Sequence, residues 1–181
     1  MLLLIPLRRI QNNPLEFAIY EHNTNGENMN LWQKFERKRN ISYTDCGFSF
    51  HFEKGIEPNL KRKYICFAKW LRKNYFFPVH INIYVLDCEQ VRLRSGQMAY
   101  GSFRWYSWRT PNIRIPSAVE PELLAEYTKD EVYEQILSSL VHELTHYYQW
   151  VLALEQSNSV SERQANYYRY RIIDMFNDTT K

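Results

Sequence analysis

The chain is poor in features that would place it in a specialised class of protein. Its 181 residues include only three cysteines, Cys46, Cys66 and Cys88, and no two of them have the close spacing of a metal-binding pair. An odd, scattered set of cysteines argues against a disulfide framework and favours free thiols in a reducing compartment. The sequence therefore predicts a cytoplasmic protein.

Long apolar runs are missing as well. No stretch approaches the length of a membrane span. The apolar start, residues 1–6, is too short for the hydrophobic region of a signal peptide and has no basic residue before it. The formal net charge of +3 is too small to imply a nucleic-acid partner. We therefore expect neither a membrane nor a nucleic acid among the partners.

What the sequence does contain is typical of an ordinary globular domain. Hydrophobic residues make up 45% of the chain and charged residues 24%, which is enough for a core without disulfide support. The patterns are weak in residues 1–57 and clear from Pro58 onward. We expect a single domain over residues 1–181, with 1–57 as an N-terminal elaboration and 58–176 as the core.

The upstream half of this core predicts one helix and a small sheet. Apolar residues recur at helical spacing over residues 58–76, and residues 79–85 alternate between apolar and polar. Two further extended stretches follow, Gly101 to Trp105 and Asn112 to Ile115. Prolines on both sides of the second stretch suggest an edge strand, because proline cannot donate to a strand ladder.

Two helices are predicted in the downstream half. Thr128 and Glu131 form a capping-box signature that opens a helix running to about Leu154. Ser159 and Glu162 form a second signature, opening a last helix that runs to about Phe176. The predicted fold class is α+β, with a small mixed sheet and its edge strand packed on a long helix that a C-terminal helix follows.

The long helix carries a His-Glu-x-x-His motif at His142, Glu143 and His146. Residues four apart lie one turn apart on the same side of a helix, so the two imidazoles can reach one metal ion. Glu143 can then serve as a general base toward an attacking water. The apolar residues of this helix occupy a different arc, so we expect the histidines to face a polar region away from the core.

A catalytic zinc site usually has three protein ligands, and no histidine follows His146. The downstream carboxylates that could complete the site are Glu155, Glu162 and Asp174. Glu155 is too close along the same helix to fold back easily. Glu162 lies just past a turn, at the start of a helix that can pack on the first, and is the favoured third ligand.

Other interpretations stay open at this stage. The two histidines could be ordinary polar residues on a helix surface. The chain could also be a regulatory or DNA-associated module that binds zinc without protease activity, because the sequence does not show whether the metal faces an open cleft.

The two motifs together carry a family resemblance. The segments His142 to His146 and Glu162 to Tyr167 resemble the zincin metallopeptidases of the gluzincin type, whose third ligand is a downstream glutamate. The Glu-x-x-Ala-Asn step resembles the ImmA/IrrE family most, and the order of the upstream elements is similar also in SprT-like proteases. The resemblance spans roughly residues 58–176 and implies a minimal zincin fold.

It also implies a function and a site. The expected activity is zinc-dependent hydrolysis of peptide bonds in a protein or peptide substrate, such as a regulator, with Zn²⁺ held by His142, His146 and Glu162. The substrate is expected to pair with an edge strand, either Asn112, Ile113, Arg114 and Ile115 or Gly101 to Trp105. Residues that could orient the ligands or stabilise an oxyanion are Tyr147, Asn166, Tyr167, Arg169 and Tyr170.

Overall fold

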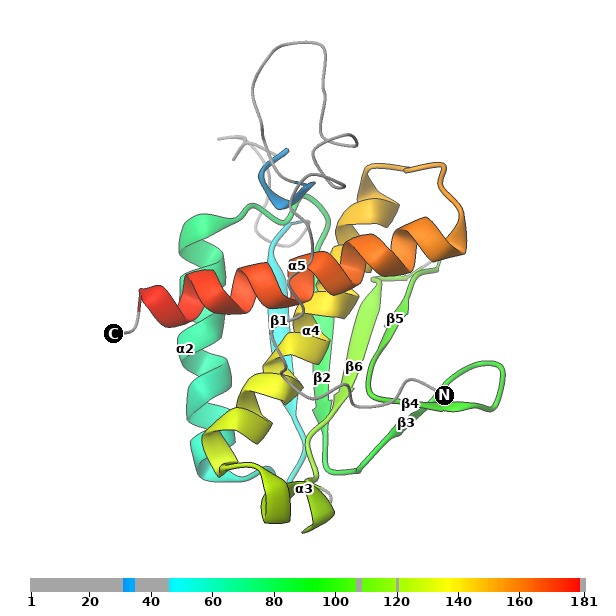
Figure 1. Cartoon of the computed structure of the whole chain (residues 1–181). Helices are drawn as coiled ribbons and strands as arrows, with labels where there is room; N and C mark the ends of the chain where they lie inside the picture. Colours follow the sequence, from blue (N-terminus) through cyan, green and yellow to red (C-terminus); the bar gives the residue numbers. More distant parts are fainter. Residues whose placement is uncertain (1–30, 35–45, 107–108, 120, 180–181) are drawn as a thin grey trace.

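The computed structural model describes residues 31–34, 46–106, 109–119 and 121–179 (Figure 1). A short 3₁₀ turn comes first, followed by strands, helices and a final helix pair. In chain order the elements are η1 (Leu31–Gln33), β1 (Phe48–Phe52), α2 (Pro58–Asn74), β2 (Ile81–Leu86), β3 (Val91–Arg92), β4 (Met98–Ala99), β5 (Ser102–Arg104), β6 (Asn112–Pro116), α3 (Pro121–Glu126), α4 (Lys129–Val151) and α5 (Asn158–Asp178).

A four-stranded mixed sheet forms the base of the fold. Its strand order is β1-β2-β6-β5, with the first three strands parallel and β5 antiparallel at the edge. Strands β3 and β4 make a separate two-stranded hairpin. The predicted α+β class, with a small mixed sheet, is confirmed.

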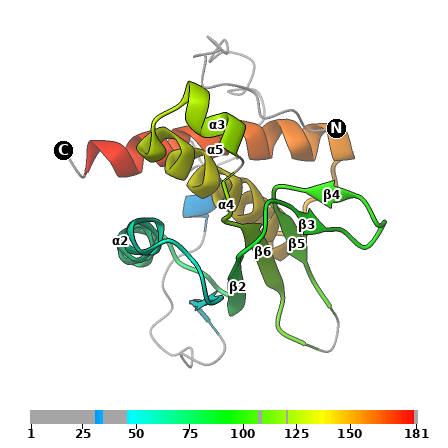
Figure 2. The same cartoon turned by 90° about the horizontal axis from the view of Figure 1, so that it is seen from below.

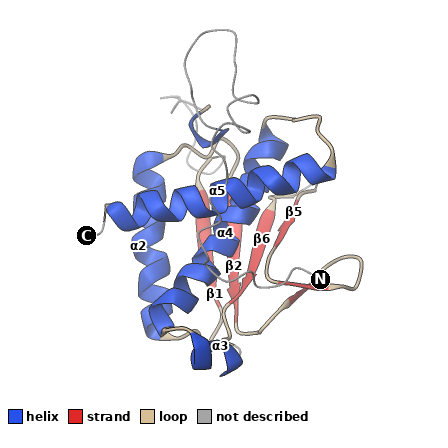
Figure 3. Ribbon diagram, viewed as in Figure 1, coloured by secondary structure: helices blue, strands red, loops and turns tan. Residues whose placement is uncertain are grey.

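The helices cover one face of this sheet (Figures 2 and 3). Helix α4 lies directly on strands β5 and β6, and α5 packs across α4. The apolar side chains of the alternating strands point toward these helices, and Ile81, Ile83, Ile113 and Ile115 are fully buried. Burial of one face of the sheet against α4 therefore fixes which side of each strand is apolar.

Local signals explain where the main helices begin. The Glu57 carboxylate caps α2 by accepting a hydrogen bond of 2.9 Å from the Leu60 N–H. At the start of α4, Thr128 and Glu131 form the predicted capping box, with both reciprocal hydrogen bonds present. Helix α4 ends at Val151, close to the predicted end.

The second capping box is wrong. Helix α5 begins at Asn158 after Ser157, whose side chain makes no capping hydrogen bond. Ser159 therefore lies inside the helix. The carboxylate of Glu162, which a capping box would direct back toward the helix start, instead points at two histidines of α4.

The prediction that Asn112 to Ile115 forms an edge strand is also wrong. Strand β6 lies between β2 and β5 and pairs with both. Proline lacks an N–H group, but its carbonyl still accepts, and Pro111 receives the Asn82 N–H at 3.1 Å. The edge strands are β1 and β5, and β5 falls within the other predicted stretch.

The core also begins earlier than residue 58. Strand β1 forms long-range parallel pairs with β2, and Trp32 of η1 is fully buried between the helices and donates to Thr145 Oγ1 at 3.2 Å. The remainder of the predicted N-terminal elaboration, residues 1–30 and 35–45, lies outside the described residues.

Candidate metal centre

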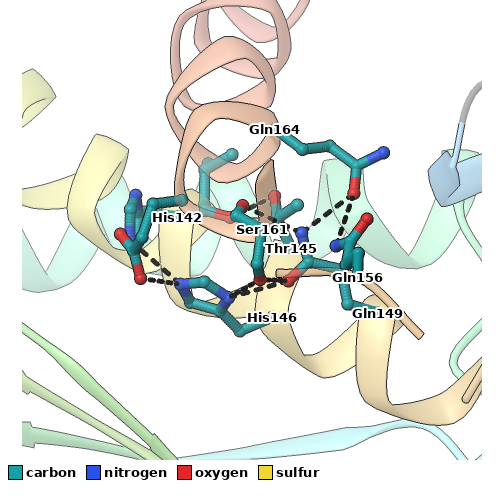
Figure 4. Close-up of polar contacts among 9 residues, drawn as sticks. His142, Thr145, His146, Gln149, Gln156, Ser161 and Gln164 are labelled. Carbon is teal, nitrogen blue, oxygen red and sulfur yellow. Dashed lines mark hydrogen bonds and ion pairs between the residues drawn. The ribbon is translucent and has the colours of Figure 1, made fainter. Parts of the chain in front are cut away.

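Helix α4 places two imidazoles side by side, as their spacing predicts. The Nε2 atoms of His142 and His146 lie 3.1 Å apart (Figure 4). Both rings come from the side of α4 that faces β5 and the start of α5. His142 is only 9% exposed and His146 is half-buried, so neither is an ordinary exposed residue of the helix surface.

Helix α5 brings a carboxylate to the same point. The two carboxylate oxygens of Glu162 divide between the histidines, with Oε2 3.3 Å from His142 Nε2 and Oε1 3.3 Å from His146 Nε2. These three side chains could hold a metal ion. Glu155 and Asp174, the other carboxylates considered from the sequence, are exposed and do not belong to this group.

The ionisable groups of this triad influence one another strongly. Hydrogen bonds to His142 and His146 hold the pKa of Glu162 well below its usual range. Burial alone would lower the pKa of His146, but the hydrogen bond to Glu162 and the charge of Glu143 raise it above its ordinary value. The site therefore concentrates negative charge beside two imidazoles, as a cation site requires.

Gln149 orients one of these imidazoles. Its amide nitrogen donates to the Ser161 carbonyl oxygen at 3.0 Å, which fixes the amide orientation and leaves Oε1 as an acceptor. That oxygen accepts from His146 Nδ1 at 2.8 Å and from Ser161 Oγ at 2.6 Å. A proton on His146 Nδ1 is thereby held by Gln149, which leaves Nε2 as the nitrogen that could bind a metal ion beside Glu162.

His142 has no comparable partner. Its Nδ1 atom is buried and makes no hydrogen bond to any described residue. Within the described part of the chain, His146 is therefore oriented by a hydrogen bond at its Nδ1 atom, and His142 is not. No motif in the sequence indicated a role for Gln149, although its position three residues after His146 places it on the next helical turn beside that ring.

Glu143 lies beside the triad and is held by strand β5. The Phe103 backbone N–H donates to its carboxylate. Gly101 leaves room for it, since a Cβ at that position would lie only 2.7 Å from Glu143 Oε1. Burial raises the pKa of Glu143, although His142, His146 and the Phe103 hydrogen bond oppose the rise.

These groups open onto a cleft of about 690 Å³ between the strands and the helices. One wall is formed by the β3–β4 hairpin and β5, and the other by α4 and the start of α5. His142, Glu143, His146 and Glu162 are the only His, Asp, Glu, Lys or Arg residues among the described residues that line it. The volume is in the range typical of ligand sites in proteins.

The residues proposed from the sequence as oxyanion donors or ligand supports do not line this cleft. The Tyr147 hydroxyl is tied to the Val79 backbone, donating to its carbonyl at 2.6 Å. The Tyr167 hydroxyl accepts from Arg171 at 2.5 Å, and Asn166 and Tyr170 are half-buried elsewhere on α5. None of these four side chains is among the described residues of the cleft.

Arg169 comes nearest to the predicted role. Its Nε donates to Ser138 Oγ at 2.8 Å, one helical turn before His142 on α4. Burial lowers the pKa of Arg169, and the negative charge of Glu143 acts in the opposite direction. It therefore adds positive charge behind the site without entering the cleft.

Comparisons of the chain with protein-family models, with curated protein sequences and with solved structures each found no match. The zincin resemblance consequently remains a prediction from two short motifs. Among the described residues, no helix combines the length and the apolar character that crossing a membrane requires.

Proposed function

We propose that this chain is a zinc-dependent peptidase that hydrolyses peptide bonds in protein substrates. The observation that carries the proposal is the convergence of His142, His146 and Glu162 beside Glu143, all four of which line one cleft. The zincin resemblance, closest to the ImmA/IrrE family, belongs to the same proposal.

The donor set fits zinc in kind and in spacing. Two histidine nitrogens and a carboxylate are a ligand set used by catalytic zinc sites. Ligands about 2.0–2.1 Å from a tetrahedral ion lie about 3.3 Å from one another. The two Nε2 atoms lie 3.1 Å apart, which fits such an ion. Each is 3.3 Å from a different oxygen of Glu162, so the carboxylate would need to turn one oxygen toward both nitrogens to complete the site.

Each side chain then has a defined task. Bound zinc would supply Lewis acidity, polarising the scissile carbonyl and making water acidic enough to attack near neutral pH. Glu143 accepts the proton of the attacking water and delivers it to the leaving nitrogen. Its raised pKa suits both steps, and the Phe103 N–H keeps the carboxylate oriented toward the cleft.

The cleft favours a catalytic site over a purely structural one. A structural zinc site is closed by a fourth protein ligand, whereas a catalytic site leaves one position for water and substrate. Only three ligand side chains gather here among the described residues, and all three border the cleft.

The test is cleavage of an unfolded protein substrate, such as casein, by zinc-loaded wild type and by Glu143→Gln. General acid–base catalysis contributes about 10²–10⁴-fold, so we expect Glu143→Gln to lose at least about 100-fold in rate while keeping its zinc. Wild-type cleavage should also stop on chelation and return with added zinc.

Asp174→Asn is the matched control, because it removes one carboxylate charge at an exposed position of α5 away from the triad. It should cleave like wild type. Equal rates for Glu143→Gln and wild type at equal zinc content would refute the proposal.

A further inference from the structure

The charge of this chain is unevenly distributed along its sequence. Residues 90–119 contain five arginines and no lysine, aspartate or glutamate: Arg92, Arg94, Arg104, Arg109 and Arg114. The whole chain carries 23 basic and 20 acidic side chains, so without this segment the remainder is net negative. The modest net charge therefore conceals a strongly cationic segment.

This segment builds the strand wall of the cleft. It contains β3, β4, β5 and β6, and its residues Leu93, Ala99, Gly101, Ser102, Phe103 and Trp105 line the cleft opposite the helices. None of the five arginines lines the cleft, and the side chains that do so from this wall are small or apolar. Arg92, Arg94 and Arg104 are nevertheless direct chain neighbours of lining residues.

Two of the arginines lie against the ring of Tyr106, the residue after Trp105. The guanidinium carbons of Arg94 and Arg109 lie 4.7 and 4.0 Å from the centre of the Tyr106 ring. A hydrogen bond from Arg94 lowers the pKa of Tyr106 to about 8. Both arginines are exposed, and neither forms an ion pair with a carboxylate in the described part of the chain. Two positive charges held together in this way attract an anionic group.

An apolar shelf is formed at Trp105, the residue that directly precedes Tyr106 in the chain. Trp105 is 55% exposed and stacks on Trp150 of α4, with ring centroids 6.5 Å apart and planes inclined by 19°. Leu93 and Leu154 also line the cleft. A large apolar side chain would cover this surface without displacing any charged group.

Strand β5 and the residues after it connect the metal centre, the shelf and the arginine pair in that order. Phe103, whose N–H holds Glu143, is followed by Trp105 and then by Tyr106. Three residues of extended chain span about 10 Å. A peptide lying along β5 from the metal centre would therefore meet the shelf first and the arginines two to four residues from its scissile bond.

We propose that the cleft selects a peptide segment with a large apolar side chain near the scissile bond and acidic side chains a few residues beyond it. The apolar side chain would lie on Trp105 and Trp150, and the acidic ones beside Arg94 and Arg109. This inference rests on the proposed peptidase function, because it defines the substrate class of the same site.

A nucleic acid fits the arginines less well. Guanidinium groups flank Tyr106, and Trp150 covers part of Trp105, so few aromatic faces are open for bases to stack on. The cleft itself presents the carboxylates of Glu143 and Glu162, which repel phosphates. A peptide with acidic groups at one end avoids that repulsion.

The experiment measures binding to the zinc-loaded Glu143→Gln full chain, so that the peptides stay intact. The probes are two fluorescein-labelled peptides with the same Phe-Leu centre, one flanked on both sides by glutamates and the other by glutamines. We expect the glutamate peptide to bind at least about tenfold more tightly, and the preference to shrink as salt screens the charges.

Adding Arg94→Gln and Arg109→Gln should reduce the preference to less than about twofold while leaving the affinity for the glutamine peptide unchanged. The matched control is Lys69→Gln with Lys73→Gln, which removes two exposed positive charges from α2 and should leave the preference intact. Trp105→Ala should weaken both peptides equally.

Equal affinity for the two peptides would overturn the inference. So would an oligothymidylate that displaces the glutamate peptide and itself requires Arg94 and Arg109, since the surface would then serve a nucleic acid. Cleavage assays separate this inference from the proposed function. Wild type that cleaves both peptides equally well retains the function and refutes the acidic preference. Wild type that binds the acidic peptide selectively but cleaves neither peptide retains the preference and refutes the function.

Discussion

The two walls of the cleft are built in different ways. The helical wall carries every histidine and carboxylate among the described cleft residues, and they come from a stretch of about twenty residues in α4 and α5. The strand wall contributes a backbone N–H, a glycine and an apolar shelf, and its segment of sequence carries five arginines and no carboxylate. Under the proposed function, the helical wall performs the chemistry and the strand wall positions and selects the substrate.

The largest effect is expected on the helical wall. Replacing Glu162 or His146 with alanine removes a ligand, so zinc affinity should fall by more than about 100-fold, since residues that only support a ligand already contribute 10–100-fold. Metal analysis after purification without chelator measures this. Glu155→Ala, which removes an exposed carboxylate outside the triad, should keep its zinc. Zinc retained by Glu162→Ala would mean that another group completes the site.

Adding a methyl group to the strand wall at Gly101 should reduce activity nearly as much as the loss of a zinc ligand. In Gly101→Ala the new Cβ would lie 2.7 Å from Oε1 and 2.9 Å from Cγ of Glu143, so that side chain must move. A misplacement of about 1 Å can cost about 100-fold in rate. We expect cleavage to fall by about 10–100-fold with unchanged zinc content, because the atoms nearest the new methyl group all belong to Glu143. Wild-type activity in this variant would contradict a catalytic role for the Glu143 position.

A smaller effect is expected at the residue that links the two helices. Gln149→Leu removes the acceptor of the His146 Nδ1 proton, and zinc affinity should fall by about 10–100-fold in competition with a chelating dye. Gln156→Leu is the control, because among the described residues the amide of Gln156 donates to Gln164 alone, at 3.4 Å, and not to a histidine. If both variants bind zinc equally well, the orientation of His146 does not depend on Gln149.

The smallest effect should come from a site far from both walls. Glu57 caps α2 and accepts from the Tyr133 hydroxyl of α4 at 2.6 Å, and these bonds hold its pKa below the ordinary value. A depressed pKa in the folded state adds stability above the unfolded pKa of about 4.3, and that stability is lost as the pH falls through the folded value.

Glu57→Gln should therefore unfold more easily than wild type at pH 7, with the difference disappearing below about pH 4. Thermal unfolding at several pH values measures this, and zinc content and cleavage should stay unchanged. A difference in stability that persists unchanged into acid would show that the charge of Glu57 is not its cause.

Local sequence patterns were sufficient to predict much of the secondary structure. The periods of α2 and α4, the capping box at Thr128 and the alternation of β2 all predicted the observed elements, since each depends on contacts within a few residues. The pairing of strands that are distant in the sequence was harder to predict. Flanking prolines suggested that β6 was an edge strand, yet its remaining N–H and carbonyl groups pair with β2 and β5 on both sides.

The same division holds within the metal centre. The sequence by itself determined that His142 and His146 share one side of a helix, because the helical repeat fixes their relative positions. It also indicated Glu162 from a turn and a helix start. Tertiary structure decided that the Glu162 carboxylate lies 3.3 Å from both imidazoles, and that Gly101 and the Phe103 N–H receive Glu143. These contacts depend on how α5 packs across α4 and on which strand occupies the sheet edge, and no local repeat in the sequence encodes either arrangement.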